Sequence, residues 1–199
     1  ASVSKSGSDT LVRFVSPEVD GVKMVQTYTL PAQGYALAVR HEGFNNGQAA
    51  IAPQLYLQLT RDGNKPPGDS MFYSTFTGPA FYSVEKKYQK VEFKNIEKVS
   101  DPDAKFERKT DQGYVAMVQH YFASAWLPDD ASQGQKVARE NFVSNLGHNL
   151  YSAGLKTQLA SIVPGQHATF DSRLFVGPQQ EKMLETVYPG LEAVKDYGI

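Results

Sequence analysis

Histidines and carboxylates are the side chains of this sequence that could bind a metal ion or transfer protons. The four histidines, His41, His120, His148 and His167, lie in different segments, with neither a His-x-His pair nor a pair four residues apart. Metal motifs need such fixed short spacings, so the pattern predicts structural histidines and no metal site. His120 stands out because it interrupts an apolar run, where a buried ring needs a hydrogen bond.

Two short segments begin like site motifs but do not complete them. Asp101-Pro-Asp103 opens like a calcium loop, but Phe106 and Gln112 occupy the positions that need Gly and Glu. Residues 68–72 begin like a nucleophile elbow but lack its closing glycine. The sequence has no cysteine, which excludes thiolate chemistry and disulfides. We therefore predict no catalytic residue, no cofactor and no metal, and hence a protein that is not an enzyme.

Charge and composition narrow the possible partners. The 199 residues carry a net charge of −1, with a pI near 6.5, which argues against a general nucleic-acid or anionic-membrane binder. The lysines between residues 86 and 98 alternate with glutamates, which is typical of a solvated strand face. No apolar run is long enough for a membrane span, and no signal peptide is present.

Residues 113–128 form the longest nearly charge-free run and contain the only tryptophan, Trp126. Apolar residues occupy both alternating faces of this run on either side of Gln119-His120, which predicts a pair of strands covered on both faces. A buried helix is the alternative that apolarity alone leaves open. The small residues Ala116, Ala123 and Ala125 leave room for another layer to approach.

The remaining chain predicts mainly antiparallel β structure, because several segments alternate apolar and polar residues. Residues 51–60 and 88–94 show this alternation, and we expect both to be strands. We expect residues 1–8 to be frayed and residues 95–112 to be a loop with one edge strand. Further strands are predicted at these ranges: 10–15, 22–30, 35–42, 71–76, 79–84, 139–146, 150–156, 159–163 and 167–176.

The last segment changes from a period of two to a helical period. Pro178 suits the first position of a helix that Pro189-Gly190 ends, and residues 191–197 predict a second short helical turn. The sequence thus divides into a β body, residues 1–177, and a helical segment, residues 178–199. Five apolar side chains of this segment must pack on the body or on something next to it, and they are our interaction candidates: Met183, Leu184, Val187, Leu191 and Val194.

The central run and its flanks resemble the large periplasmic domain of the YidC family of bacterial membrane protein insertases. The resemblance is ordered along residues 22–199 and rests on these motifs: Phe76-Thr-Gly-Pro-Ala80, Lys87-Tyr-Gln-Lys90, Gly113-Tyr-Val-Ala-Met-Val-Gln119, Tyr121-Phe-Ala123, Ala125-Trp-Leu-Pro128, Asn145-Leu-Gly147, Pro164-Gly-Gln166, Val176-Gly-Pro178, Lys182-Met183 and Asp196-Tyr-Gly198.

This resemblance implies an antiparallel β super-sandwich with two short C-terminal α-helices, on the periplasmic face of a bacterial inner membrane. It also implies membrane spans outside this chain, further strands before its first residue, and an N-terminal sheet edge left open. The implied role is binding or scaffolding for Sec translocon accessory subunits and client membrane proteins.

The runner-up is a carbohydrate-binding or aldose mutarotase-like domain, because super-sandwiches also occur in sugar-processing enzymes. That activity needs a His and a carboxylate converging in one pocket, and the sequence pairs none of its histidines in this way.

Overall fold

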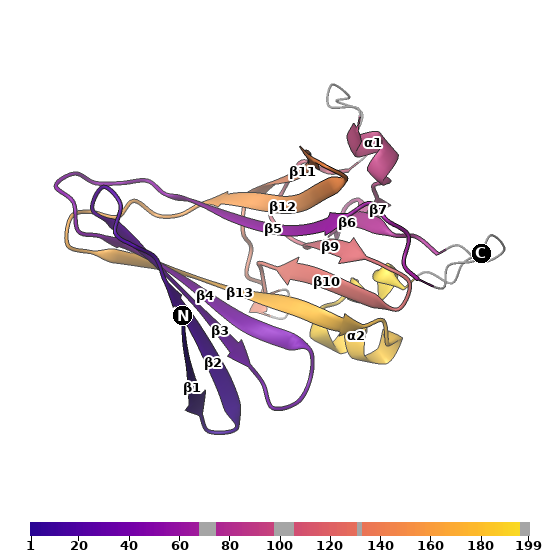
Figure 1. The fold of residues 1–199 in the computed structure, drawn as a ribbon, viewed down its shortest axis with the longest axis horizontal. Coiled ribbons are helices and arrows are strands. Elements are labelled where there is room, and N and C mark those ends of the chain that lie inside the picture. Colours follow the sequence, from indigo (N-terminus) through magenta and orange to yellow (C-terminus); the bar gives the residue numbers. More distant parts are fainter. Residues whose placement is uncertain (68–74, 98–105, 131–132, 196–199) are drawn as a thin grey trace. The chain divides into compact units, whose positions relative to one another are not determined.

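The computed structural model describes residues 1–67, 75–97, 106–130 and 133–195, and 54% of the chain is strand. Two compact units share the chain. Unit 1 combines residues 1–55 with 157–174, and unit 2 combines residues 56–156 with 175–199. The predicted mainly antiparallel β fold is confirmed (Figure 1).

Unit 1 is an antiparallel sheet of strands in the order β1-β2-β3-β4-β13. Residues 1–8, predicted to be frayed, instead contain strand β1, which pairs with β2 from Ser2 opposite Arg13 to Ser6 opposite Asp9. Ladder hydrogen bonds order this segment although its side chains are all exposed. The bounds are β1 Ser2–Ser6, β2 Asp9–Val15, β3 Val22–Leu30, β4 Ala36–Asn45 and β13 His167–Pro178.

The buried residues of unit 1 include Val25, Val39 and Ile162. Asn45, at the end of β4, is almost fully buried and donates through Nδ2 to the carbonyl oxygens of Ala49 and Ile162, at 2.8 and 2.7 Å. Its Oδ1 accepts the N–H of Gly47 at 3.0 Å. This side chain therefore satisfies backbone groups of the turn at residues 45–47.

Unit 2 contains two groups of strands. The first follows the order β13-β10-β9-β6-β7, with β13 contributing its last residues, and the second follows β5-β12-β11-β8. The bounds are β5 Gln54–Asp62, β6 Gly78–Ser83, β7 Lys87–Lys90, β8 Lys109–Thr110, β9 Tyr114–Val118, β10 Phe122–Leu127, β11 Arg139–Gly147 and β12 Leu150–Gln158.

The central run forms the predicted hairpin and not the alternative buried helix. Strands β9 and β10 pair antiparallel, with Ala125 opposite Ala116 and Trp126 opposite Val115. Every residue of β9 is buried, which confirms that both faces are covered.

On one face, alanines of three adjacent strands form a row. Ala80, Ala116 and Ala125 stand opposite one another across β6, β9 and β10, and each is fully buried. Side chains this small let another layer approach the sheet closely, as the sequence predicted. That layer is the C-terminal segment, whose Leu184 and Leu191 belong to the same apolar cluster.

On the other face, Trp126 points toward strand β5 of the second sheet. Its Nε1 donates to the carbonyl oxygen of Gln58 at 3.1 Å, and its side chain is 5% exposed. Within the second sheet, strands β5 and β12 also lie close together at Gly154. A Cβ there would lie 2.2 Å from the carbonyl oxygen of Leu57. Helices on one face and a second sheet on the other make unit 2 a layered β sandwich.

Some predicted elements were wrong. The strand predicted at residues 88–94 ends at Lys90, and helix α1 follows at Phe93–Glu97. The cause is a pair of apolar residues three apart: Ile96 is buried, and Phe93 packs on Tyr151 with ring centroids 4.8 Å apart. The predicted strand 159–163 is only a bridge between Ile51 and Ile162, and most of 71–76 lies outside the described residues.

The C-terminal segment turns as predicted at Pro189-Gly190. Its first piece is helix α2, Glu181–Val187, and its second is the 3-10 helix η2, Leu191–Val194. The second piece is therefore tighter than the α-helix that the resemblance implied. Gly190 has a φ of 98°, and a Cβ there would meet the Tyr82 ring at 2.3 Å, so this bend needs glycine.

Candidate functional site

The structure places the five predicted interaction residues along the C-terminal segment of unit 2. Leu184, Leu191 and Val194 are fully buried against the alanine row, whereas Met183 and Val187 are half-buried beside the same cluster. Of the two alternatives that the sequence left open, packing on the β body or on something next to it, the structure shows the first. Their role in binding a partner stays a prediction.

A buried polar network, which we call the Asp129 network, anchors this segment. Arg139 contacts Asp129 at 3.0 Å with both side chains almost completely buried, and donates to the carbonyl oxygen of Gly113 at 2.9 Å. The Tyr188 hydroxyl donates to the other Asp129 oxygen at 2.7 Å and accepts the N–H of Gly113 at 3.0 Å. The end of α2 is thereby bound to strands β9 and β11.

Burial and charge explain why the tyrosine hydroxyls around this network are protonated. Burial, together with the bond to Asp129, raises the pKa of Tyr188 above its ordinary value, so the hydroxyl stays protonated and donates. Burial also raises the pKa of Tyr114, whose hydroxyl donates to the carbonyl oxygen of Gly190 at 2.9 Å. A buried carboxylate needs such partners: loss of Arg139 would leave the Asp129 charge uncompensated, and loss of the Tyr188 hydroxyl would remove one of its hydrogen bonds.

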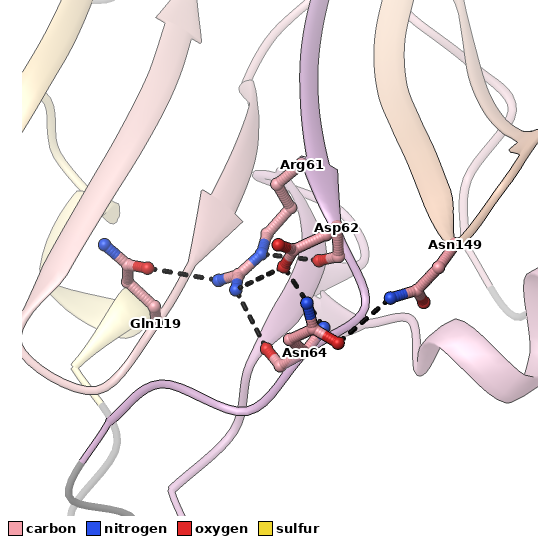
Figure 2. Close-up of polar contacts among 5 residues, drawn as sticks. All are labelled: Arg61, Asp62, Asn64, Gln119 and Asn149. Carbon is pink, nitrogen blue, oxygen red and sulfur yellow. Dashed lines mark hydrogen bonds and ion pairs between the residues drawn. The ribbon is translucent and has the colours of Figure 1, made fainter.

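A second polar network joins three turns of unit 2 around Arg61 (Figure 2). Arg61 donates to the carbonyl oxygens of Asp62 and Asn64, at 2.8 and 3.0 Å, and to Oε1 of Gln119 at 3.1 Å. Asn149 of the β11–β12 turn donates to Oδ1 of Asn64 at 3.0 Å. The end of β5, the β9–β10 turn and the β11–β12 turn are thus held together.

The Asp62 carboxylate, which lies beside Arg61, completes this second network. Oδ1 of Asp62 accepts the backbone N–H of Asn64 at 3.1 Å and lies 3.3 Å from the Arg61 guanidinium. The backbone N–H of Asn64 and the Arg61 side chain lower the pKa of Asp62 below its ordinary value. Asp62 therefore remains ionised, which suits a structural role in the turn and not proton transfer near neutral pH.

A cavity of about 400 Å³ adjoins Arg61, and we call it the β5 groove. Its walls are the end of β5 on one side and β9, β10 and their turn on the other. The volume is in the range of ligand pockets, and hydroxyl, amide and guanidinium groups accompany an apolar thioether. The lining residues are Leu59, Thr60, Arg61, Asp62, Met117, Gln119 and Ser124.

His120 and His167 each contact a neighbouring side chain in the described part of the chain. His120 contacts Oγ1 of Thr75 at 2.6 Å, and His167 stacks on Phe44. Neither the β5 groove nor a second cavity of about 320 Å³, beside Phe76 and Phe93, is lined by a histidine. Within the described ranges, no cluster of three or more His, Asp and Glu side chains could hold a metal ion.

The family model described as YidC periplasmic domain matches residues 1–199. The chain belongs to this family. The membrane protein insertase YidC of Cupriavidus metallidurans is 46% identical over 192 residues, covering 96% of this chain and 33% of that protein. The insertase of Janthinobacterium sp. (strain Marseille) is 45% identical over 197 residues, covering 98% of this chain and 33% of that protein.

The YidC periplasmic domain thus spans about a third of the length of these relatives. Its family description assigns it to the periplasm. In the described part of the chain, each helix is too short or too polar to cross a bilayer. Among solved structures, heparan sulfate lyase HepC (a mutant) from Pedobacter heparinus aligns with a TM-score of 0.46 and 9% identity, covering 89% of this chain and 21% of that one.

Sequence reasoning missed the two polar networks of this YidC periplasmic domain. Asp62 followed by Asn64 is a pattern typical of an Asx turn, and it could have indicated the turn around Arg61. Asp129 directly follows the apolar run, which could have indicated a buried carboxylate. No sequence pattern indicated the partners of Arg61 and Asp129. Gln119 lies 58 residues from Arg61, and Tyr188 lies 59 residues from Asp129.

Proposed function

We propose that this chain is a non-enzymatic domain of a membrane protein insertase, which binds or scaffolds client membrane proteins and accessory subunits of the Sec translocon. Membership of the YidC periplasmic domain family supports this proposal, as do relatives that carry the insertase name. The described residues offer hydrogen-bonding walls and apolar surface, which suit binding. The domain works without a cofactor.

We assign the binding of extended polypeptide to the β5 groove, and this groove is the observation on which the proposal rests. Strand β5 stands at the edge of its four-stranded sheet, where an added strand gains backbone hydrogen bonds. Thr60 and Ser124 line the groove with hydroxyl groups, while Met117 offers an adaptable apolar contact. Extended segments of different sequence share their backbone groups, so this surface suits many clients.

The C-terminal segment has a second role in this proposal. Residues 1–177 form the binding body, and residues 178–199 connect it to a membrane span that follows. Because Leu184, Leu191 and Val194 are buried in unit 2, the segment is a fixed part of the domain and not a free linker. A partner at this segment would contact the half-buried Met183 and Val187.

Site-specific photo-crosslinking in the full-length insertase tests the groove. A photoreactive residue at Thr60, which is exposed and lines the groove, is expected to crosslink to a nascent membrane protein during insertion. The matched control is Glu140, also exposed but on β11, which pairs with the far edge strand β8. Equal crosslinking from both positions, or none from Thr60, would refute the assignment.

A further inference from the structure

The turn between β9 and β10 exposes two large aromatic side chains at one end of unit 2. Tyr121 is 70% exposed and Phe122 is 53% exposed, although the strands on either side are largely buried. We call residues 119–122 the aromatic turn. Such a pair costs solubility unless something covers it, and rings at a loop tip are typical of a contact surface.

The aromatic turn is held in a fixed shape. Within it, the N–H of Gln119 donates to the carbonyl oxygen of Phe122 at 3.0 Å. The Arg61 network holds the Gln119 side chain, as Figure 2 shows, and His120 contacts Thr75. The two exposed rings are therefore presented on an ordered frame, which lowers the entropy lost when they bind.

The chain returns to this turn shortly before it leaves the domain. Gln179, just before α2, donates its backbone N–H to the carbonyl oxygen of Tyr121 at 2.9 Å and its side-chain amide to that of Gln119 at 2.6 Å. Helix α2 then runs from the turn to Tyr188 in the Asp129 network, and η2 returns toward the start of α2. Lys195, the last described residue, contacts Glu181 at 3.3 Å, two residues after Gln179.

We propose that the aromatic turn contacts the lipid bilayer surface, with Tyr121 and Phe122 in its interfacial layer. This inference rests on the proposed function, in which the C-terminal segment leads to a membrane span. In that arrangement the bilayer lies on the side of unit 2 where the chain, at Gln179 and Lys195, passes the turn. Aromatic rings favour the interfacial layer, where an apolar ring and a polar edge both find suitable surroundings.

The charges near the turn are consistent with a membrane contact that is made mainly by the two aromatic rings. Near the turn, Glu181 and Glu185 accompany Lys182 and Lys195, so the α2 end has no excess of positive charge. Attraction to anionic lipids therefore adds little, and burial of the two rings supplies the favourable free energy. Two rings alone bind weakly, but attachment through the span makes the contact intramolecular.

The test uses the full-length insertase, reconstituted into vesicles of phosphatidylethanolamine and phosphatidylglycerol. A cysteine at position 122 (Phe122→Cys) carries an environment-sensitive nitrobenzoxadiazole label, and lipids carry a nitroxide near the headgroup. The matched control is Val84→Cys, which is 52% exposed at the other end of the same sheet. Since Tyr82 pairs with Tyr114 and Gly78 with Val118, the two labels are separated by roughly the length of β9, about 15 Å.

We expect nitroxide lipids to reduce the label's emission at position 122 at least about two-fold more than at position 84. A second label at Tyr121→Cys should behave like that at 122, which guards against one poorly folded variant. Equal quenching at 122 and 84 would overturn the proposal. Shielding of position 122 from a water-soluble quencher without lipid quenching would also overturn it, since a protein partner would then cover the turn.

The two proposals fail separately. If crosslinking from Thr60 to clients persists while position 122 stays unquenched, the membrane contact is wrong and the groove assignment stands. If position 122 is quenched while Thr60 gives no crosslink, the membrane contact stands and the groove assignment is wrong.

Discussion

His41 links the stability of unit 1 to pH through a single buried ring. Its Nδ1 lies 3.4 Å from Nε2 of Gln26 on β3, and its ring is 6.3 Å from that of Phe170 on β13. Burial lowers the pKa of His41 to about 4, against a smaller opposing effect of the Asp171 carboxylate. The charged imidazolium is therefore disfavoured in the folded chain.

The sign of the pH effect follows from this lowered pKa. Between the unfolded pKa of about 6.5 and the folded value, the unfolded chain binds the proton more readily. Stability is full above the unfolded pKa and falls as the pH drops toward the folded one. We expect wild-type protein to lose about 2 kcal/mol more than His41→Gln between about pH 7.5 and pH 4.5. Urea denaturation at both pH values measures this difference, and equal losses would contradict it.

Trp126 is the aromatic residue for which sequence and structure agree most directly. It is 5% exposed, and its indole donates to the backbone of Gln58 in the facing sheet. Trp126→Ala should lower the free energy of unfolding by about 3–5 kcal/mol through the cavity that it leaves. Trp126→Phe, which keeps a ring but loses the hydrogen bond, should cost less. A loss below roughly 1 kcal/mol for the alanine variant in chemical denaturation would disprove tight packing.

At the scale of elements, the Asp129 network fixes the C-terminal segment to strands β9 and β11. Tyr188→Phe removes the hydroxyl that donates to Asp129 and accepts from Gly113. Because these groups are left unsatisfied, the free energy of unfolding should fall by about 1–3 kcal/mol. Amide exchange of residues 181–195 should accelerate, with a smaller change in strand β12. Tyr35→Phe, at an exposed position of unit 1, serves as the control. It should leave the free energy of unfolding and the amide exchange of residues 181–195 unchanged.

The two helical pieces should respond unequally to a buried charge. Leu184 is fully buried in the alanine-row cluster, whereas Val187 is half-buried at its margin. Leu184→Asp should therefore loosen residues 178–195 more than Val187→Asp, because a carboxylate in an apolar cluster is costly. We expect both variants to reduce insertion by the full-length protein, and Leu184→Asp to reduce it more. Full activity and unchanged amide protection in both variants would argue against a fixed connection.

At the scale of the whole molecule, the domain should be stable without a metal ion. The described residues contain no cluster of three His, Asp or Glu side chains able to hold one. Prolonged dialysis against a chelator should leave the urea unfolding curve and the bound-metal content unchanged. Zinc retained at one equivalent per chain would contradict this prediction, and interconversion of sugar anomers by the isolated domain would favour the mutarotase-like alternative.

The sequence by itself determined the family, the mainly antiparallel β fold and the central hairpin. Residues 113–128 predicted strands covered on both faces because apolar side chains occupy both parities of the alternation, and a period of two is a local property. The helical period of residues 178–188 predicted α2 in the same way. The ordered motifs added the family, because several short motifs in a fixed order are far more specific than composition.

The tertiary structure alone decided where polar groups meet. The pairs Arg61–Gln119 and Asp129–Tyr188 join residues almost sixty positions apart, and no local pattern encodes a contact between separate strands. Helix α1 also required the tertiary context, because Tyr151 and the buried side of Ile96 override the alternation around Phe93. The residues of the aromatic turn are adjacent in the sequence, but the exposure of its rings and its hydrogen bonds to Gln179 appear only in the tertiary structure.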